Sequence, residues 1–327
     1  MTQPQTILQL TGSVWIAAVV SVALIMGYLS VNALMIIWME RKVSARMQRR
    51  LGPTERGPFG LLQTVFDMVK LLGKELLTPS HVNRALYLAA PVVVFAPVMA
   101  VCSLFPVTER WIFHDHSIAV VLVLAFGSFS VVGIFLAGWG SNNKFALLGA
   151  VRSVAQNVSY EIPLILAILP VVMMARSLSL VDITAAQASL PHVLVQPLAF
   201  LILLVAGTAE TNRAPFDIPE AESELVGGFH TEYSGMRFGL FFFAEYSNMI
   251  IVAALAAVLF LGGWRGPLLP DVAWFFLKVY AIIFVMMWFR WTFPRVRFDQ
   301  LMSFAWLVLV PLALANLLVT AIAIKVL

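Results

Sequence analysis

Long apolar blocks dominate the chain and determine the elements that the sequence predicts. Eight blocks are long enough, or nearly so, to cross a bilayer as a helix, which takes about 20 apolar residues. The fourth is short and polar at its start, and the fifth contains Gln196 and Pro197, so these two are the least regular. The predicted spans cover residues 13–38, 86–106, 118–138, 160–175, 192–209, 238–263, 272–293 and 304–325.

A different pattern follows the first span, between residues 59 and 75. Apolar and polar positions alternate there at helical spacing, which predicts an amphipathic helix lying at the membrane surface or under a partner protein. A basic anchor for anionic lipid headgroups is an alternative that explains much of the charge. That alternative does not explain Asp67, nor Glu40 at the end of the first span. One face carries Leu62, Phe66, Val69 and Gly73, and the other carries Gln63, Asp67, Lys70 and Lys74.

Composition supports the membrane assignment. Of the 327 residues, 61% are hydrophobic and only 12% are charged, whereas about a quarter of the residues in a soluble domain are charged. Helices are the expected spanning element because each helix satisfies its own backbone hydrogen bonds in lipid. The predicted fold class is therefore all-α: a single membrane domain, residues 1–327, forming a polytopic bundle of about eight transmembrane helices plus a surface amphipathic helix.

The basic residues predict which connections face the inner side of the membrane. Most of the 21 Lys and Arg lie in the segments after the first, third, fifth and seventh spans. Such a bias fits the positive-inside rule, so these connections are expected on the cytoplasmic side or its equivalent. They cover residues 39–85, 139–159, 210–237 and 290–303.

The cysteine and histidine content excludes several kinds of site. Cys102 is the one cysteine, so an internal disulfide or an iron–sulfur cluster held by this chain is excluded. No His, Cys, Asp or Glu run has the spacing of a zinc site. Metal and electron-carrying cofactors are therefore not expected on this chain itself.

The connection between residues 209 and 235 is unusually acidic. Arg213 is its one basic residue, so the positive-inside rule does not account for the segment. A helix N-terminus after Pro219 would explain Glu220 and Glu222, because carboxylates complement the helix dipole there. Crowded carboxylates at a membrane boundary also raise one another's proton affinity and can pass protons. The six acids are Glu210, Asp217, Glu220, Glu222, Glu224 and Glu232.

Two further carboxylates lie within or against predicted spans. Glu161 opens the fourth span and Glu245 lies about two turns into the sixth. A carboxylate at bilayer depth is costly and usually marks a pathway or a buried partner. An internal ion pair or a neutral hydrogen-bonded acid is the alternative. The last inner connection supplies Arg290, Arg295 and Arg297 as candidate counter-ions, although they also fit an ordinary basic cap on a span.

Six stretches of the chain carry a resemblance to a known family. They are residues 40–42, 138–144, 155–161, 209–235, 241–246 and 294–300. Together they resemble the quinone-site membrane subunit of respiratory complex I (the NuoH family) and its mitochondrial equivalent, NADH dehydrogenase subunit 1. The resemblance covers nearly the whole chain in order, and the 210–233 block is highly specific.

The resemblance implies three groups of site residues. In that family the chain forms much of a narrow tunnel through which a quinone reaches an iron–sulfur cluster held by neighbouring subunits. Residues matching the tunnel or its entrance are Glu40, Arg41, Asp67, Arg290 and Arg295. Residues matching the acidic coupling loop are Glu210, Arg213, Asp217, Glu220, Glu222 and Glu224. Residues matching the start of the proton path are Glu161, Glu232 and Glu245.

The resemblance also implies the surroundings of the chain. Its substrate would be a quinone, while the iron–sulfur clusters, FMN and NADH would be bound by partner subunits of the hydrophilic arm, and small membrane subunits would complete the complex. The expected location is the bacterial inner (plasma) membrane, with the mitochondrial inner membrane as an alternative. No nucleic acid is expected as a partner, and no activity is expected of the isolated chain.

Two rival functions share parts of this pattern. An energy-converting hydrogenase or ferredoxin-linked complex would contain a related subunit, but its acidic loop is expected to be less complete than residues 220–224. A secondary transporter would place its charges near the bilayer midplane, usually with internal repeats, whereas here the acids gather at one membrane face.

Overall fold

The computed structural model describes residues 13–109, 111–113, 115–219 and 222–326, with only the backbone described for Val14, Glu222 and Ser223. Helices, and no strands, make up its regular structure within these ranges. The principal helices are α2 (Val14–Met47), α3 (Leu62–Gly73), α4 (Arg84–Cys102), α5 (Ala119–Gly140), α6 (Lys144–Ala175), α7 (Leu180–Ala186), α8 (His192–Val195), α9 (Pro197–Glu210), α10 (Glu222–Leu225), α11 (Gly235–Phe260), α12 (Asp271–Thr292), α13 (Phe298–Phe304) and α14 (Val310–Val326).

Seven helical segments are long and apolar enough to cross a membrane: α2, α4, α5, α6, α11, α12 and the continuous run Phe298–Val326, which contains α13 and α14. Helix α9 is a shorter apolar helix. The all-α polytopic fold class is thereby confirmed. The fifth predicted block divides into α8 and α9 at Gln196. Pro197 explains the break, because proline lacks an N–H and disfavours helical backbone in the residue before it. With 14 residues, α9 rises only about 21 Å, less than the hydrocarbon core.

Two helices extend beyond the predicted spans at one end. The first continues through Glu40 to Met47. The fourth begins at Lys144, not near residue 160, so most of the expected connection 139–159 is helical. The side chain of Asn143 caps this helix by accepting a hydrogen bond from the N–H of Phe145. The apolar pattern missed the extension because it detects only the part of a helix that faces lipid.

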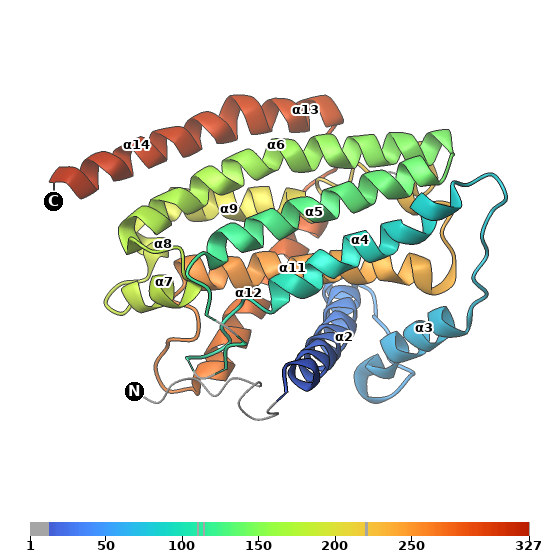
Figure 1. Ribbon diagram of the computed structural model, residues 1–327, viewed down its shortest axis with the longest axis horizontal. Helices are drawn as coiled ribbons and strands as arrows, with labels where there is room; N and C mark the ends of the chain where they lie inside the picture. The colour runs from blue at the N-terminus through green and yellow to red at the C-terminus, as the bar shows by residue number, and fades with distance from the viewer. Residues whose placement is uncertain (1–12, 110, 114, 220–221, 327) are drawn as a thin grey trace.

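The long helices form a bundle in which α4, α5, α6, α11 and α14 run alongside one another, while α2 and α12 cross them obliquely (Figure 1). Helix α11 is the most buried span, and the final segment, Phe298–Val326, is the least buried. The amphipathic helix α3 lies beside one end of α2. It contains the apolar and polar faces that the sequence predicts.

Hydrogen bonds show that the four predicted inner connections meet at one end of the bundle. The N–H of Leu77 donates to Ser234 Oγ, and Asn142 Nδ2 donates to the carbonyl of His81. The last connection joins them where the N–H of Val296 donates to the carbonyl of Pro215. We call this end, formed by residues 48–83, 141–143, 211–219, 222–234 and 293–297, the inner end.

Lys278, a charged residue within a span, has a structural role at the opposite end. Its ammonium group donates hydrogen bonds to the carbonyls of Leu261, Gly263 and Arg265, at distances of 2.6–2.9 Å. These carbonyls follow the C-terminus of α11, where a cation complements the helix dipole. This charge is therefore satisfied by backbone and stays apart from the inner carboxylates.

Candidate functional site

Four charged side chains from four segments form one buried cluster at the inner end. Arg213, in the connection after α9, lies between two carboxylates: its Nε is 2.9 Å from Glu245 of α11, and its guanidinium is 3.4 Å from Glu40 of α2. Arg290 of α12 forms an ion pair with the same oxygen of Glu40. We call Glu40, Arg213, Glu245 and Arg290 the inner cluster.

Tyr246 completes the surroundings of the inner cluster. Its hydroxyl donates a hydrogen bond to the second oxygen of Glu40 at 2.8 Å. The guanidinium of Arg213 also lies over the Tyr246 ring, 4.2 Å from its centroid, a geometry that favours a cation–π interaction. The aromatic ring therefore covers one face of the arginine while its hydroxyl orients the glutamate.

Burial makes the pairing within the inner cluster essential. The side chains of Arg213, Glu40 and Glu245 are 7%, 9% and 14% exposed, and Arg290 is 31% exposed. Two cations and two anions balance, which removes the large cost of an unpaired buried charge. The sequence placed these four residues in three separate roles, and the structure brings them into contact.

The loop that carries Arg213 is held by α6. Gln156 Nε2 donates hydrogen bonds to the carbonyls of Ala209 and Phe216, at 2.7 and 2.9 Å. Asn212 adopts a left-handed backbone conformation with a φ of 50°, which asparagine tolerates better than most residues. This turn directs the chain back across the bundle and places Arg213 between α2 and α11.

A second group of ion pairs lies at the surface of the inner end. Arg41 of α2 pairs with Asp67 of α3 at 2.6 Å, and Gln63 donates to the same carboxylate at 3.0 Å. Arg295 pairs with Asp217 at 3.0 Å. These contacts fix α3 against α2 and the last connection against the acidic segment. They are more exposed than the inner cluster, so each contributes less to stability.

Glu224 is paired with Arg152, a residue that the sequence did not single out. The two side chains are 2.7 Å apart. The Arg152 hydrogen bond and charge hold the pKa of Glu224 below its ordinary value of 4.5. The signal that was missed is an arginine within the segment 144–159: once this segment is recognised as helix, Arg152 becomes a candidate counter-ion for the acidic connection.

The Glu224 pair leads to a prediction about pH. A lowered folded-state pKa gives stabilisation that is present above the ordinary value and is lost as the pH falls through the folded-state value. Glu224→Gln should therefore lower the melting temperature slightly at neutral pH, and the difference should disappear as the pH falls below 4.5. Thermal unfolding across this range tests it, with the exposed Glu55→Gln as a control. A constant difference at all pH values would contradict the ion-pair explanation.

Glu210 lies beside two small cavities. They have volumes of about 40 and 30 Å³, and both are lined by Glu210, Ser130, Thr211 and Asn248. The second also reaches Glu245, which belongs to the inner cluster. Each cavity is large enough for a water molecule, which needs about 10–15 Å³ and polar partners.

Polar groups continue from Glu210 towards α5 and α6. Asn157 lines the second cavity, and its buried Oδ1 has no hydrogen-bond partner in the described part of the chain. Glu161 of α6 accepts a short hydrogen bond from Ser128 of α5. Glu245 and Glu210 therefore share a polar region within the helices, and Glu161 lies on the adjoining helix α6.

Glu232 lies apart from this region. Its carboxylate accepts a hydrogen bond from Asn143 at 2.7 Å and is 3.8 Å from His81. The described contacts thus place it among the surface connections of the inner end. Glu220 lies outside the described residues, as does the side chain of Glu222. In the part of the chain that the structure describes, no group of three or more His, Cys, Asp or Glu could hold a metal ion.

Comparisons with known proteins agree with this architecture. The family model for NADH dehydrogenase matches residues 19–321. The H subunit of NADH-quinone oxidoreductase from Dehalococcoides mccartyi (strain CBDB1) is 49% identical, over 95% of this chain and 88% of its own. The H subunit from Geobacillus kaustophilus is 51% identical over 86% of each chain. A form of the H subunit numbered 2, from Syntrophobacter fumaroxidans, is 47% identical, over 94% of this chain and 95% of its own.

The matches extend across almost the whole chain and include all seven long apolar segments. They confirm the resemblance found in the sequence. This chain belongs to the NADH dehydrogenase family, among the H subunits of NADH-quinone oxidoreductase.

Proposed function

We propose that this chain is the membrane subunit of a proton-translocating NADH:quinone oxidoreductase that forms part of the quinone passage and couples quinone reduction to proton movement. The names of the relatives support the enzyme class. The observation that carries the finer proposal is the inner cluster, in which α2, α11, α12 and the acidic connection bring three ion pairs together.

The redox chemistry defines what this chain has to supply. Reduction of a quinone to a quinol takes up two electrons and two protons. Within this proposal NADH, FMN and the iron–sulfur clusters belong to partner subunits of the hydrophilic arm, so electrons arrive from outside the chain. This chain supplies an apolar passage for the quinone tail, polar groups near the head and a source of protons.

The inner end has the features of such a passage. Helix α3 leaves apolar side chains such as Phe66 and Val69 exposed beside the Arg41–Asp67 pair, so an apolar molecule with a polar head meets both surfaces it needs. Arg295 and Asp217 lie on another part of the inner end. Glu40 and Arg290 lie deeper, within the inner cluster.

The proton path of the proposal follows the connected carboxylates. Glu245 is held by Arg213, and one small cavity is lined by both Glu245 and Glu210, while a second adjoins Glu210. From Glu210 the path would continue to Glu161 on α6. A change of charge near the quinone would alter the balance of the inner cluster and so the proton affinity of Glu245. Water in the cavities would pass the proton onward, while Glu224 and Glu232 respond at the surface of the acidic connection.

We further propose the bacterial plasma membrane as the location, with the inner end facing the cytoplasm. The distribution of Lys and Arg supports this orientation, and the three relatives compared above come from bacteria. Subunits of the hydrophilic arm would then dock on the inner end, and small membrane subunits would cover exposed apolar helix faces.

The enzyme class is tested by purifying the native assembly through a tag on this chain. The proposal expects NADH-driven quinone reduction that is sensitive to quinone-site inhibitors. An assembly that accepts electrons only from reduced ferredoxin or hydrogen would instead identify the energy-converting alternative. Recovery of the chain alone, without a redox partner, would refute the enzyme proposal and favour a transporter.

The α3 contact gives a prediction about quinone entry. Asp67→Asn removes a pair whose side chains are 43% and 33% exposed, so the expected loss of stability is at most about 1 kcal/mol. The KM for a long-tailed quinone should rise more than kcat falls, because α3 is less firmly held at the passage entrance. Steady-state kinetics measure this, with Glu55→Gln as the matched exposed control. Unchanged KM with a large loss of kcat would place Asp67 in the chemistry instead.

A further inference from the structure

A large apolar cavity lies away from the inner end and takes no part in the proposed quinone passage. It has a volume of about 460 Å³ and is lined by residues of α2, α4, α11, α12 and the connection after α4. Buried Ile250 and Phe275 form part of its wall. Ligand sites of proteins have volumes of roughly 300–1,000 Å³ and mostly apolar linings, so this cavity has the dimensions of a binding site.

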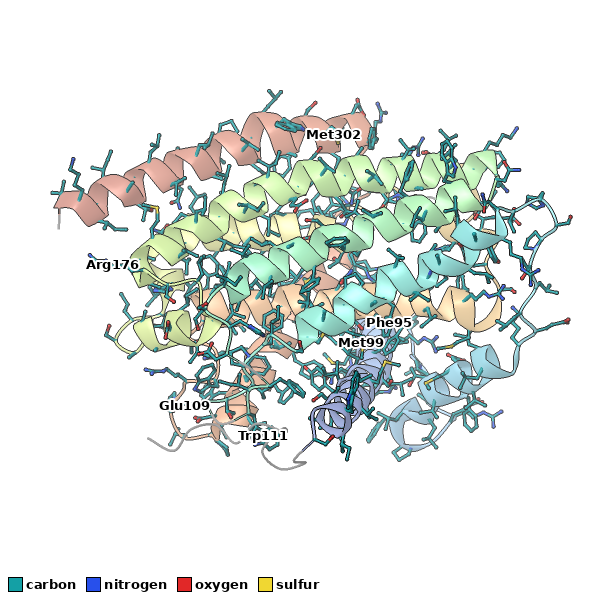
Figure 2. All side chains as sticks on the ribbon, in the orientation of Figure 1. Phe95, Met99, Glu109, Trp111, Arg176 and Met302 are labelled. Atoms are coloured by element: carbon teal, nitrogen blue, oxygen red, sulfur yellow. The ribbon has the colours of Figure 1, made fainter. Side chains whose placement is uncertain are left out.

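Its position separates it from the inner cluster. Tyr28 lines the cavity, and it precedes Glu40 on α2 by about 18 Å of helical rise. Phe275, also in the lining, precedes Arg290 on α12 by about 22 Å. Figure 2 shows Trp111 and Glu109 in the connection that follows the C-terminal end of α4. The cavity therefore occupies the outer half of the membrane-spanning region.

The lining determines what kind of molecule fits. Among the described residues that form it there is no charged side chain, and the polar side-chain groups are limited to the Tyr28 hydroxyl, the Cys102 thiol and the Trp111 indole. A phosphate or carboxylate would therefore be buried against these residues without a counter-ion, at a large cost. An uncharged hydrocarbon chain needs no counter-ion, and the apolar lining offers it surroundings like those of the bilayer.

The cavity also opens onto the exposed apolar surface of the chain. Leu24 of α2 is 54% exposed and Trp111 is 66% exposed, and both belong to the lining. A chain from the surrounding bilayer can thus enter sideways without crossing water. Trp111 is also the kind of residue that lies at the level of lipid headgroups. From this apolar lining and its continuity with the bilayer, we propose that the cavity binds an acyl chain of an outer-leaflet phospholipid.

The bound chain would fill the space between α2 and the α11–α12 pair and hold these helices at a fixed separation. The site is independent of the proposed proton path, because the lining residues that the structure describes include no carboxylate. Competition distinguishes a phospholipid in this cavity from a quinone: excess quinone should not displace a bound phospholipid.

The test uses native membranes that contain the whole assembly. A phosphatidylethanolamine with a diazirine on one acyl chain is incorporated and photolysed, and the tagged chain is then digested and analysed by mass spectrometry. Label is expected to concentrate on peptides containing Cys102, Trp111 and Ile251, above the label on the exposed apolar surface of α14. Excess long-tailed quinone is expected to leave this pattern unchanged.

Two variants and a matched control sharpen the test. Leu24→Trp narrows the cavity mouth and Ile251→Trp fills the cavity, and both should lose most of the concentrated label. Val22→Trp is the control, because Val22 lies on the same helix, is also 54% exposed and is outside the lining. If a variant fails to assemble, the wild-type map decides alone. Label no stronger than on α14, or label displaced by quinone, would overturn the proposal.

Discussion

Replacing Arg213 with methionine is expected to remove most quinone reductase activity and to destabilise the protein by about 3–5 kcal/mol. The reason is electrostatic. Arg213 lies between Glu40 and Glu245, and its guanidinium is almost completely buried. Without it, Glu245 loses its described counter-ion and Glu40 retains only Arg290, so the inner cluster carries an uncompensated negative charge within the bundle.

Two further variants separate charge from packing. Arg237→Met removes a basic residue of the same region, but Arg237 is more exposed and its guanidinium contacts Thr78, so we expect a much smaller effect. The double variant Arg213→Met with Glu245→Met restores neutrality. It should recover much of the lost stability while quinone reduction stays impaired. Thermal unfolding and NADH-driven activity measure the two effects, and a double variant as unstable as Arg213→Met would contradict the charge explanation.

Glu210→Gln is expected to lower the coupled rate by about a hundredfold, in the range of groups that transfer protons directly. Glutamine keeps nearly the same shape and can still bond to water in the two adjacent cavities, but it cannot take up and release a proton. Because Glu210 shares a cavity with Glu245 and the proposed path continues from it to Glu161, the substitution should interrupt the path with little change in folding. Initial rates of NADH-driven quinone reduction, measured together with proton uptake by membrane vesicles, test this expectation.

Glu109→Gln is the matched control for this prediction. Glu109 is an exposed carboxylate in the connection after α4, at the end of the bundle away from α3 (Figure 2). Its loss should leave both rates close to wild type. An equal loss in the two variants would indicate a general effect of removing negative charge, not a proton path through Glu210.

The sequence predicted much of the fold because apolar blocks report directly on lipid-facing helices. The amphipathic pattern around Asp67 also predicted α3. Two features of the helices were not predicted from the apolar pattern. One is the division into α8 and α9 at Gln196, which Pro197 causes, and the other is the polar first part of α6, which contains Arg152. Hydrophobicity alone marks neither boundary, because a proline sets the first and polar residues form the second.

For the candidate site, the sequence selected residues but not their geometry. Arg290 was expected as a counter-ion for the carboxylates within the spans, whereas its ion pair is with Glu40, and Glu245 pairs with Arg213. The pairing of Arg213 with both glutamates depends on how three helices pack, and no local pattern contains that information. The same holds for Ser128, whose importance follows only from its contact with Glu161.

Simultaneous measurement of electron and proton transfer in sealed vesicles tests the central claim most directly. The tagged assembly is reconstituted with quinone and given NADH, and quinone reduction is recorded together with the internal pH, for wild type, Glu210→Gln and Glu109→Gln. The account predicts coupled activity in wild type and Glu109→Gln, and loss of proton translocation in Glu210→Gln. Proton translocation at the wild-type rate in Glu210→Gln would contradict a path through this carboxylate.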